Sequence, residues 1–174
     1  ISIKDIVNKK ALVLDVCSVK IKPINLMLKY LPETTEIIGT HPLFGPQSAK
    51  DGIENLNIVL TNVRSQKFKS VKNFLKDKLK LNILEETKEN HDKKMAMVQG
   101  LTHFIAKGLK SVGIYDTPLK TISYDNLLKF YNILENETDD LFYTIQNENP
   151  YTKEMRKNFI QKLIDIENSL NVEE

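Results

Sequence analysis

The apolar residues of this chain change their spacing at about residue 86, and this change divides the chain into two kinds of structure. Before it, four short β-branched or aliphatic runs alternate with stretches of helical spacing. The runs cover residues 11–16, 36–39, 57–61 and 81–84, and the helical stretches cover residues 23–30 and 66–79. Strands of this length separated by helices are typical of an α/β layer with a largely parallel sheet. We therefore predict an α/β domain over residues 1–86.

After residue 86 the strand signals stop, and four stretches of helical spacing follow. Thr87 is a good N-cap with Glu89 in the first turn, and the first helix is expected to end near Gly113. Its expected core stripe consists of Val98, Leu101, Ile105, Leu109 and Val112. The other three helices are expected around residues 127–134, 141–145 and 155–170. We predict an all-helical domain over residues 87–174, with apolar faces long enough to favour a homodimer formed through these helices.

The composition argues against several classes of partner. In 174 residues, 25 Lys and Arg stand against 23 Asp and Glu, so no concentrated basic surface suggests a nucleic acid. The longest apolar runs have strand length, far below the roughly 20 residues of a membrane helix. Cys17 is the single cysteine, and no Cys/His cluster has zinc spacing, so we predict neither an intrachain disulfide nor a metal site. The start of the chain does not resemble a secretory signal, and a cytoplasmic location is expected.

Two segments place polar side chains where an α/β sheet binds ligands, at the carboxyl ends of strands. Ser18 and Lys20 follow the first strand, although capping the next helix is the simpler role for Ser18. His41 lies in the run GTHPLFGP, whose two Pro and two Gly predict a rigid loop. An imidazole in such a loop can act as a general base at neutral pH, but a His hydrogen-bonded within a turn fits the segment equally well.

A third segment runs from His91 to His103 at the start of the helical region. At about 100° per residue, Gln99 and His103 lie roughly 40° apart, on a face distinct from the core stripe. A ligand or a neighbouring domain could occupy that face. A solvated role is the simpler alternative for His103, and a structural first-turn role fits His91 equally well. All three histidines of the chain fall in the second and third segments, which favours a site there.

Taken together and in this order, the runs DVCSVK, GTHPLFGP and HDKKMAMVQGLTHF resemble the motifs of the prephenate/arogenate dehydrogenase family of tyrosine biosynthesis. The resemblance implies the C-terminal half of a Rossmann-like nucleotide-binding domain, followed by a helical dimerisation domain. It implies NAD(P)-dependent oxidative decarboxylation of prephenate to 4-hydroxyphenylpyruvate, with arogenate as the alternative substrate. The cofactor would be NAD or NADP.

The resemblance also implies roles for individual residues. His41 would take the proton of the substrate hydroxyl as hydride leaves, and Ser18 would hydrogen-bond to His41 and to the same hydroxyl. Ser18 and Pro42 would contact the cofactor. The expected substrate-binding residues are His103, Gln99, Lys20 and Lys129. Lys129 stands where family members commonly hold a substrate carboxylate with Arg, and Lys supplies the charge without the bidentate fork.

The sequence contains no GxGxxG, the turn that places a pyrophosphate at a helix N-terminus. We therefore expect the chain to begin in the second half of the nucleotide-binding domain and to be incomplete for cofactor binding by itself. Two other interpretations stay open. One is a non-catalytic binding or dimerisation module with affinity for substrate or tyrosine. The other is a different Rossmann dehydrogenase, such as a hydroxyacid dehydrogenase, although Lys93, Lys94 and Lys107 lack the rest of its catalytic-lysine motif.

Overall fold

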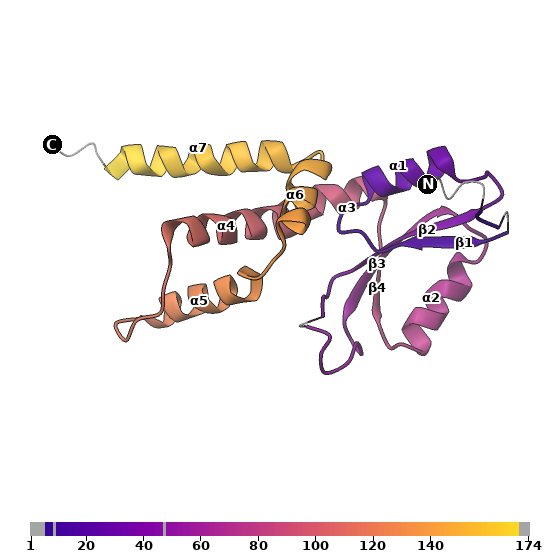
Figure 1. Cartoon of the computed structure of the whole chain (residues 1–174), viewed down its shortest axis with the longest axis horizontal. Coiled ribbons are helices and arrows are strands. Elements are labelled where there is room, and N and C mark those ends of the chain that lie inside the picture. The colour runs from indigo at the N-terminus through magenta and orange to yellow at the C-terminus, as the bar shows by residue number, and fades with distance from the viewer. Residues whose placement is uncertain (1–5, 9, 47, 171–174) are drawn as a thin grey trace. The chain divides into compact units, whose positions relative to one another are not determined.

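The computed structural model describes residues 6–8, 10–46 and 48–170 and divides the chain into two compact units (Figure 1). The division falls between Asp92 and Lys93, inside a helix and a few residues after the predicted change at residue 86. Among the described residues, no helix combines the length and the apolar character needed to cross a membrane.

The first unit is built on a four-stranded sheet with the order β1-β2-β3-β4. Its strands are β1 (Leu12–Asp15), β2 (Glu36–Pro42), β3 (Asn57–Arg64) and β4 (Asn82–Glu85). The pairs β1–β2 and β3–β4 are parallel, whereas β2 and β3 are antiparallel. The predicted α/β layer is confirmed. The sheet is mixed because a loop, and not a helix, joins β2 to β3, and an antiparallel pair needs no helical crossover.

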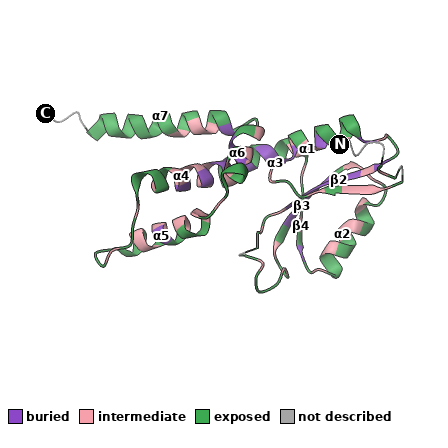
Figure 2. Cartoon of the chain, viewed as in Figure 1, coloured by how far each residue is buried: buried purple, intermediate pink, exposed green. Residues whose placement is uncertain are grey.

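Two helices, α1 (Ile21–Tyr30) and α2 (Phe68–Asp77), pack against this sheet. Ile24 of α1 lies so close to β2 that a Cβ added at Gly39 would be 2.8 Å from its Cδ1 atom. On the α2 side, Phe68 and Leu75 pack against a buried cluster that contains Leu60. Burial is concentrated along β2 and β3 (Figure 2). Gly39 therefore permits the close approach of α1 to the strand that also carries His41.

The remainder of the described chain is helical, as predicted. The helices are α3 (Lys88–Met95), a π-helical segment η2 (Ala96–Leu101), α4 (Thr102–Val112), α5 (Ile122–Leu134), α6 (Asp139–Glu148) and α7 (Thr152–Leu170). The predicted N-cap is confirmed, since Oγ1 of Thr87 accepts a hydrogen bond from Asn90 N. Gly113 ends α4 in the left-handed conformation, with φ of 79°.

The π-helical segment η2 overturns the predicted core stripe. A π-helix forms hydrogen bonds from i to i+5, so a helical wheel at about 100° per residue does not hold through it. Val98 and Val112 were expected to face the core and are 61% and 85% exposed. The buried residues of η2 and α4 are instead Ala96, Gly100, His103 and Ala106. The shared face predicted for Gln99 and His103 loses its geometric basis for the same reason.

Candidate active site

The candidate site of the first unit lies at the ends of β1 and β2. β1 ends at Asp15, whose carboxylate accepts a hydrogen bond of 3.1 Å from Thr40 N of β2. β2 continues through His41 to Pro42, and His41 pairs in register with Val59 of β3. The prediction that His41 lies in a loop was therefore wrong, because pairing with β3 extends the strand past it. The strand fixes the backbone of His41 more firmly than a loop would.

His41 is buried and its ring is bonded to a second histidine. Its Nδ1 atom lies 2.9 Å from Nε2 of His91, and the two rings meet edge to face at 66°. In turn, Nδ1 of His91 lies 2.7 Å from Oδ1 of Asp92. The three residues are only 4%, 2% and 0% exposed in this order. A buried polar group without a hydrogen bond is energetically costly. The hydrogen bonds that link His41, His91 and Asp92 therefore hold the three side chains in one arrangement.

Asp92 also holds the N-terminus of α1. Its Oδ1 accepts a hydrogen bond of 2.7 Å from Lys20 N, and its Oδ2 accepts one of 2.9 Å from Ile21 N. These amides have no partner inside the helix, and the positive end of the helix dipole favours a carboxylate there. The cap that was considered for Ser18 is not formed, because Lys20 occupies the N-cap position and its own side chain makes no capping bond. A residue from a distant part of the sequence supplies the cap instead.

Burial determines the charge of the groups around His41. Desolvation lowers the pKa of His41 to about 3, with further lowering from the charges of His91 and Lys20, and Asp92 opposes the shift. The ring is therefore neutral near pH 7. Desolvation also lowers the pKa of Lys20, against the opposing effect of Asp15, the carboxylate with which its ammonium pairs.

The other residues predicted in this unit follow β1 or end β2, and none has a hydrogen bond to the His41 ring. Ser18 is half-buried, and in the described structure it makes no hydrogen bond to His41, whose Nδ1 is used by His91. Lys20 is fully buried against Asp15, so the expectation that it reaches a substrate gains no support. Pro42 is half-buried at the end of β2. The catalytic role of Ser18 and the cofactor contacts of Ser18 and Pro42 stay predictions.

Sequence reasoning missed the two residues that organise the site. His91 was left open between a part in a site and a structural first-turn role, and Asp92 was assigned no role. A usable signal was present, because an adjacent His and Asp in the first turns of a helix can form a hydrogen-bonded pair. Their partner His41 lies 50 positions earlier in the chain, and only the folded sheet brings it within reach.

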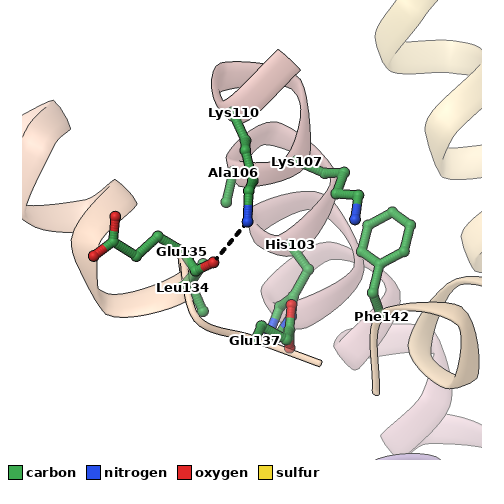
Figure 3. Close-up of a pocket in the computed structure, with 8 residues that line it drawn as sticks. All are labelled: His103, Ala106, Lys107, Lys110, Leu134, Glu135, Glu137 and Phe142. Atoms are coloured by element: carbon green, nitrogen blue, oxygen red, sulfur yellow. Dashed lines mark hydrogen bonds and ion pairs between the residues drawn. The ribbon is translucent and has the colours of Figure 1, made fainter. Parts of the chain in front are cut away.

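In the second unit, His103 lines a small pocket at the start of α4 (Figure 3). Its Nδ1 atom lies against the Glu137 carboxylate, an ion pair when the ring is protonated. Lys110 closes another side, where its Nζ donates a hydrogen bond of 3.1 Å to the Glu135 carbonyl. His103 is 8% exposed, so the solvated role considered from the sequence is wrong. The cavity of about 20 Å³ has room for a water molecule but not for a ring-sized ligand.

Lys129 and Gln99 occupy other parts of the second unit. Lys129 on α5 is 69% exposed along its side chain and forms an ion pair of 2.7 Å with Asp125. It lines a separate cavity of about 360 Å³, which His103 does not border. Gln99 is half-buried in η2. The structure therefore does not bring His103 and Lys129 into one pocket, and their substrate roles, like that of Gln99, stay predictions.

Both arginines of the chain serve the backbone. Arg64 donates to the carbonyls of Thr35 and Pro32 at 3.0 and 2.8 Å. Arg156 donates to the carbonyl of Gln146 at 2.7 Å. The Nε and Nη2 groups of Arg64, which form one edge of its fork, are therefore already bonded, whereas Arg156 donates from Nη1 alone. Among the described residues, no group of three or more His, Cys, Asp and Glu is placed to hold a metal ion.

Comparison with known proteins gives two family matches and several relatives. Residues 2–83 match the family described as prephenate dehydrogenase, nucleotide-binding domain, and residues 108–174 match the one described as TYRAAT1-like, C-terminal domain. Arogenate dehydrogenase 1, chloroplastic, of Arabidopsis thaliana is 34% identical over 157 residues, which is 87% of this chain and 24% of that protein. A probable arogenate/prephenate dehydrogenase of Methanocaldococcus jannaschii is 29% identical over 175 residues, 92% of this chain and 38% of that protein. The chain thus spans well under half the length of these relatives.

Solved structures share the fold. The prephenate dehydrogenase from A. aeolicus, in complex with hydroxyphenyl propionate and NAD+, matches with a TM-score of 0.73 at 19% identity and covers 97% of this chain and 62% of that one. The arogenate dehydrogenase of Synechocystis matches with a TM-score of 0.62 at 18% identity, over 94% of this chain and 64% of that one. The predicted fold class, a Rossmann-like α/β part followed by helices, is confirmed.

Proposed function

Because the chain belongs to the prephenate/arogenate dehydrogenase family, we propose that it forms part of an NAD(P)-dependent enzyme that oxidises and decarboxylates prephenate to 4-hydroxyphenylpyruvate. The observation that carries the proposal is the neutral, buried ring of His41, held by a hydrogen bond at Nδ1. Arogenate, which has an amino group in place of the side-chain keto oxygen, is the alternative substrate.

His41 supplies the base for this reaction. Within the described part of the chain its Nε2 atom has no hydrogen-bond partner, while Nδ1 is bonded to His91. Nε2 can accept the proton of the substrate hydroxyl, which raises electron density on the carbon that bears it and favours loss of hydride. Correct positioning then suffices for loss of CO₂, since aromatisation of the ring drives that step. Ser18 is proposed to donate or accept a hydrogen bond at the same hydroxyl.

The dinucleotide would supply the hydride acceptor, but the residues described here do not fit its pyrophosphate. The sequence has no GxGxxG. The N-terminus of α1 is taken by Asp92, and at the N-terminus of α2 the amide of Lys67 donates to Glu36. Neither helix therefore begins with the glycine-rich turn that binds a pyrophosphate. Ser18 and Pro42 are the proposed contacts of this chain with NAD or NADP.

The test is the substitution His41→Asn in the full-length protein, assayed with prephenate and arogenate and with both dinucleotides. We expect the turnover number to fall at least about a hundredfold, the lower range of general-base contributions, with little change in substrate affinity. Thr61→Val is the matched control, because Thr61 is a buried polar residue of β3 whose hydroxyl donates to the Glu86 carbonyl and not to His41. Near-normal turnover of His41→Asn would remove His41 from the catalytic role. Absent turnover of both substrates by the unmodified protein would defeat the substrate assignment.

We also propose that the helical unit forms a homodimer. Helix α7 exposes five large aliphatic side chains, those of Ile160, Leu163, Ile164, Ile166 and Leu170. Two apolar grooves of about 400 Å³ each border Phe159 of the same helix. Contiguous exposed apolar surface of this kind favours association with a protein partner, and a second copy is the partner that this family membership suggests.

A further inference from the structure

We infer that His91 and Asp92 are positioning residues that fix the tautomer of His41 and thereby select its Nε2 atom as the proton acceptor. The catalytic meaning of this inference rests on the proposed function. The tautomer itself is a property of the unliganded protein and can be measured without any reaction.

Asp92 determines which atoms donate and which accept in these hydrogen bonds. Backbone N–H groups can only donate, so the bonds from Lys20 N and Ile21 N oblige both carboxylate oxygens of Asp92 to accept. Oδ1 also lies 2.7 Å from Nδ1 of His91. This contact is attractive only if Nδ1 of His91 carries a hydrogen, because a bare nitrogen would place two acceptors against each other. Asp92 therefore makes His91 a donor at Nδ1.

His91 in turn determines which nitrogen of His41 carries a hydrogen. A neutral imidazole has one N–H and one lone pair, so a His91 that is protonated at Nδ1 presents a lone pair at Nε2. That lone pair faces Nδ1 of His41 at 2.9 Å, and His41 must supply the hydrogen of this bond. With its hydrogen on Nδ1, neutral His41 has its own lone pair on Nε2. Through His91, the Asp92 carboxylate thus determines which ring nitrogen of His41 carries the hydrogen.

The arrangement also gives the accepted proton a favourable route. When Nε2 of His41 takes a proton from the substrate hydroxyl, the hydrogen on Nδ1 can pass to Nε2 of His91. His41 is then neutral again with its hydrogen on Nε2, and the positive charge lies on His91, next to the Asp92 carboxylate. Since all three residues are buried, an imidazolium beside a carboxylate costs less than an isolated one on His41. In hydrolase triads a buried carboxylate also fixes the tautomer of the catalytic histidine, but there it bonds to that histidine directly and the proton is not passed on.

Nitrogen NMR on the ¹⁵N-histidine-labelled chain near neutral pH tests the inference directly. Long-range ¹H–¹⁵N correlations distinguish a protonated ring nitrogen from one with a lone pair. We expect both His41 and His91 to be protonated at Nδ1 and bare at Nε2. A hydrogen on Nε2 of His41 in the unmodified protein would overturn the inference, and this result requires no variant to fold.

Two variants then separate positioning from general structure. In His91→Phe a ring remains but the acceptor is lost, so the Nε2–H form of His41 should become populated and turnover should fall about tenfold or more. In His91→Gln the amide oxygen can again accept from Nδ1 of His41, which should restore the single tautomer and part of the turnover. The signals of His103, whose Nδ1 atom lies against the Glu137 carboxylate and not against either of these rings, serve as the internal control.

The two proposals fail in different ways. If His41 changes tautomer in His91→Phe while turnover stays normal, the role of His41 as base is wrong and the positioning of its ring stands. If turnover falls in His91→Phe while His41 keeps its hydrogen on Nδ1, positioning through the tautomer is overturned.

Discussion

A histidine buried as deeply as His41 couples the stability of the fold to pH. In the folded protein its pKa is about 3, whereas in an unfolded chain it is about 6.5. Between these values the unfolded state binds a proton that the folded state does not. The contribution of His41 to stability is therefore complete above the unfolded pKa and is lost as pH falls toward the folded pKa. Over that window the slope due to His41 approaches about 1.4 kcal/mol per pH unit.

The measurement is urea unfolding of the unmodified chain and of His41→Asn at a series of pH values from about 7 down to about 4. The difference between the two free energies of unfolding should shrink as the solution becomes more acidic, because only the unmodified chain has this buried imidazole. Carboxylates such as Glu36, whose pKa is lowered to about 2 by hydrogen bonds from Ser65 and Lys67, affect both proteins equally. Parallel curves for the two proteins would contradict a depressed pKa at His41.

The residues of the site could be predicted from the sequence only in part. His41 was identifiable because a lone imidazole among Pro and Gly residues is conspicuous. Its partners were not, because the pairing of His41 with His91 depends on the register of β2 and on where the chain enters α3. Nor could the sequence show that the carboxylate of Asp92, and not the hydroxyl of Ser18, caps α1. Such contacts between distant segments are set by tertiary structure.

At the scale of elements, the irregular segment η2 makes the buried face of a helix unpredictable from the spacing of its apolar residues. The existence of the helix from Thr87 to Gly113 and both of its end signals were predictable from local chemistry. Which face it buries was not, because the i to i+5 hydrogen bonds of η2 rotate the following residues out of α-helical phase. The buried Gly100 inside η2 lies against α7, where an added Cβ would meet Thr152 and Met155, and its carbonyl accepts a hydrogen bond of 2.7 Å from Gln146 of α6.

Gly100→Ala should destabilise the helical unit. A Cβ at this position would lie 2.5 Å from Cγ2 of Thr152, which is fully buried and hydrogen-bonded to the carbonyls of Ile145 and Asn149. The neighbour cannot rotate away without losing these bonds, so α7 must shift. Overpacking of this kind costs about 1–3 kcal/mol. Urea unfolding followed by circular dichroism measures the loss.

Gly108→Ala is the matched control on the neighbouring helix α4. A Cβ at Gly108 meets no atom within 4 Å, and the residue is exposed. Because alanine is the better helix former, this variant should be more stable by about 0.5–1 kcal/mol. Equal effects of the two substitutions would show that helix propensity, and not contact with Thr152, governs Gly100.

At the scale of the whole molecule, the order of an α/β part and a helical part could be predicted because strand and helix periodicities differ strongly. The antiparallel pair β2–β3 could not, because the 14 residues 43–56 between these strands show no pattern that distinguishes a long loop from a poor helix. The cytoplasmic location stays a prediction, and two relatives from Arabidopsis thaliana are named as chloroplastic. What the chain associates with depends on surfaces that only the fold reveals, and α7 is the clearest of these.

The proposed homodimer can be tested by sedimentation velocity on the chain at micromolar concentration, where we expect a dimer. Ile164→Glu should shift the chain to monomer, because a carboxylate buried against an apolar partner surface has no compensating charge. Ile122→Glu is the matched control. Ile122 is more exposed than Ile164, lies at the start of α5, and there a negative charge suits the helix dipole, so this variant should remain dimeric. A monomeric unmodified chain would refute the dimer, and dissociation by both variants would show that α7 is not the specific contact.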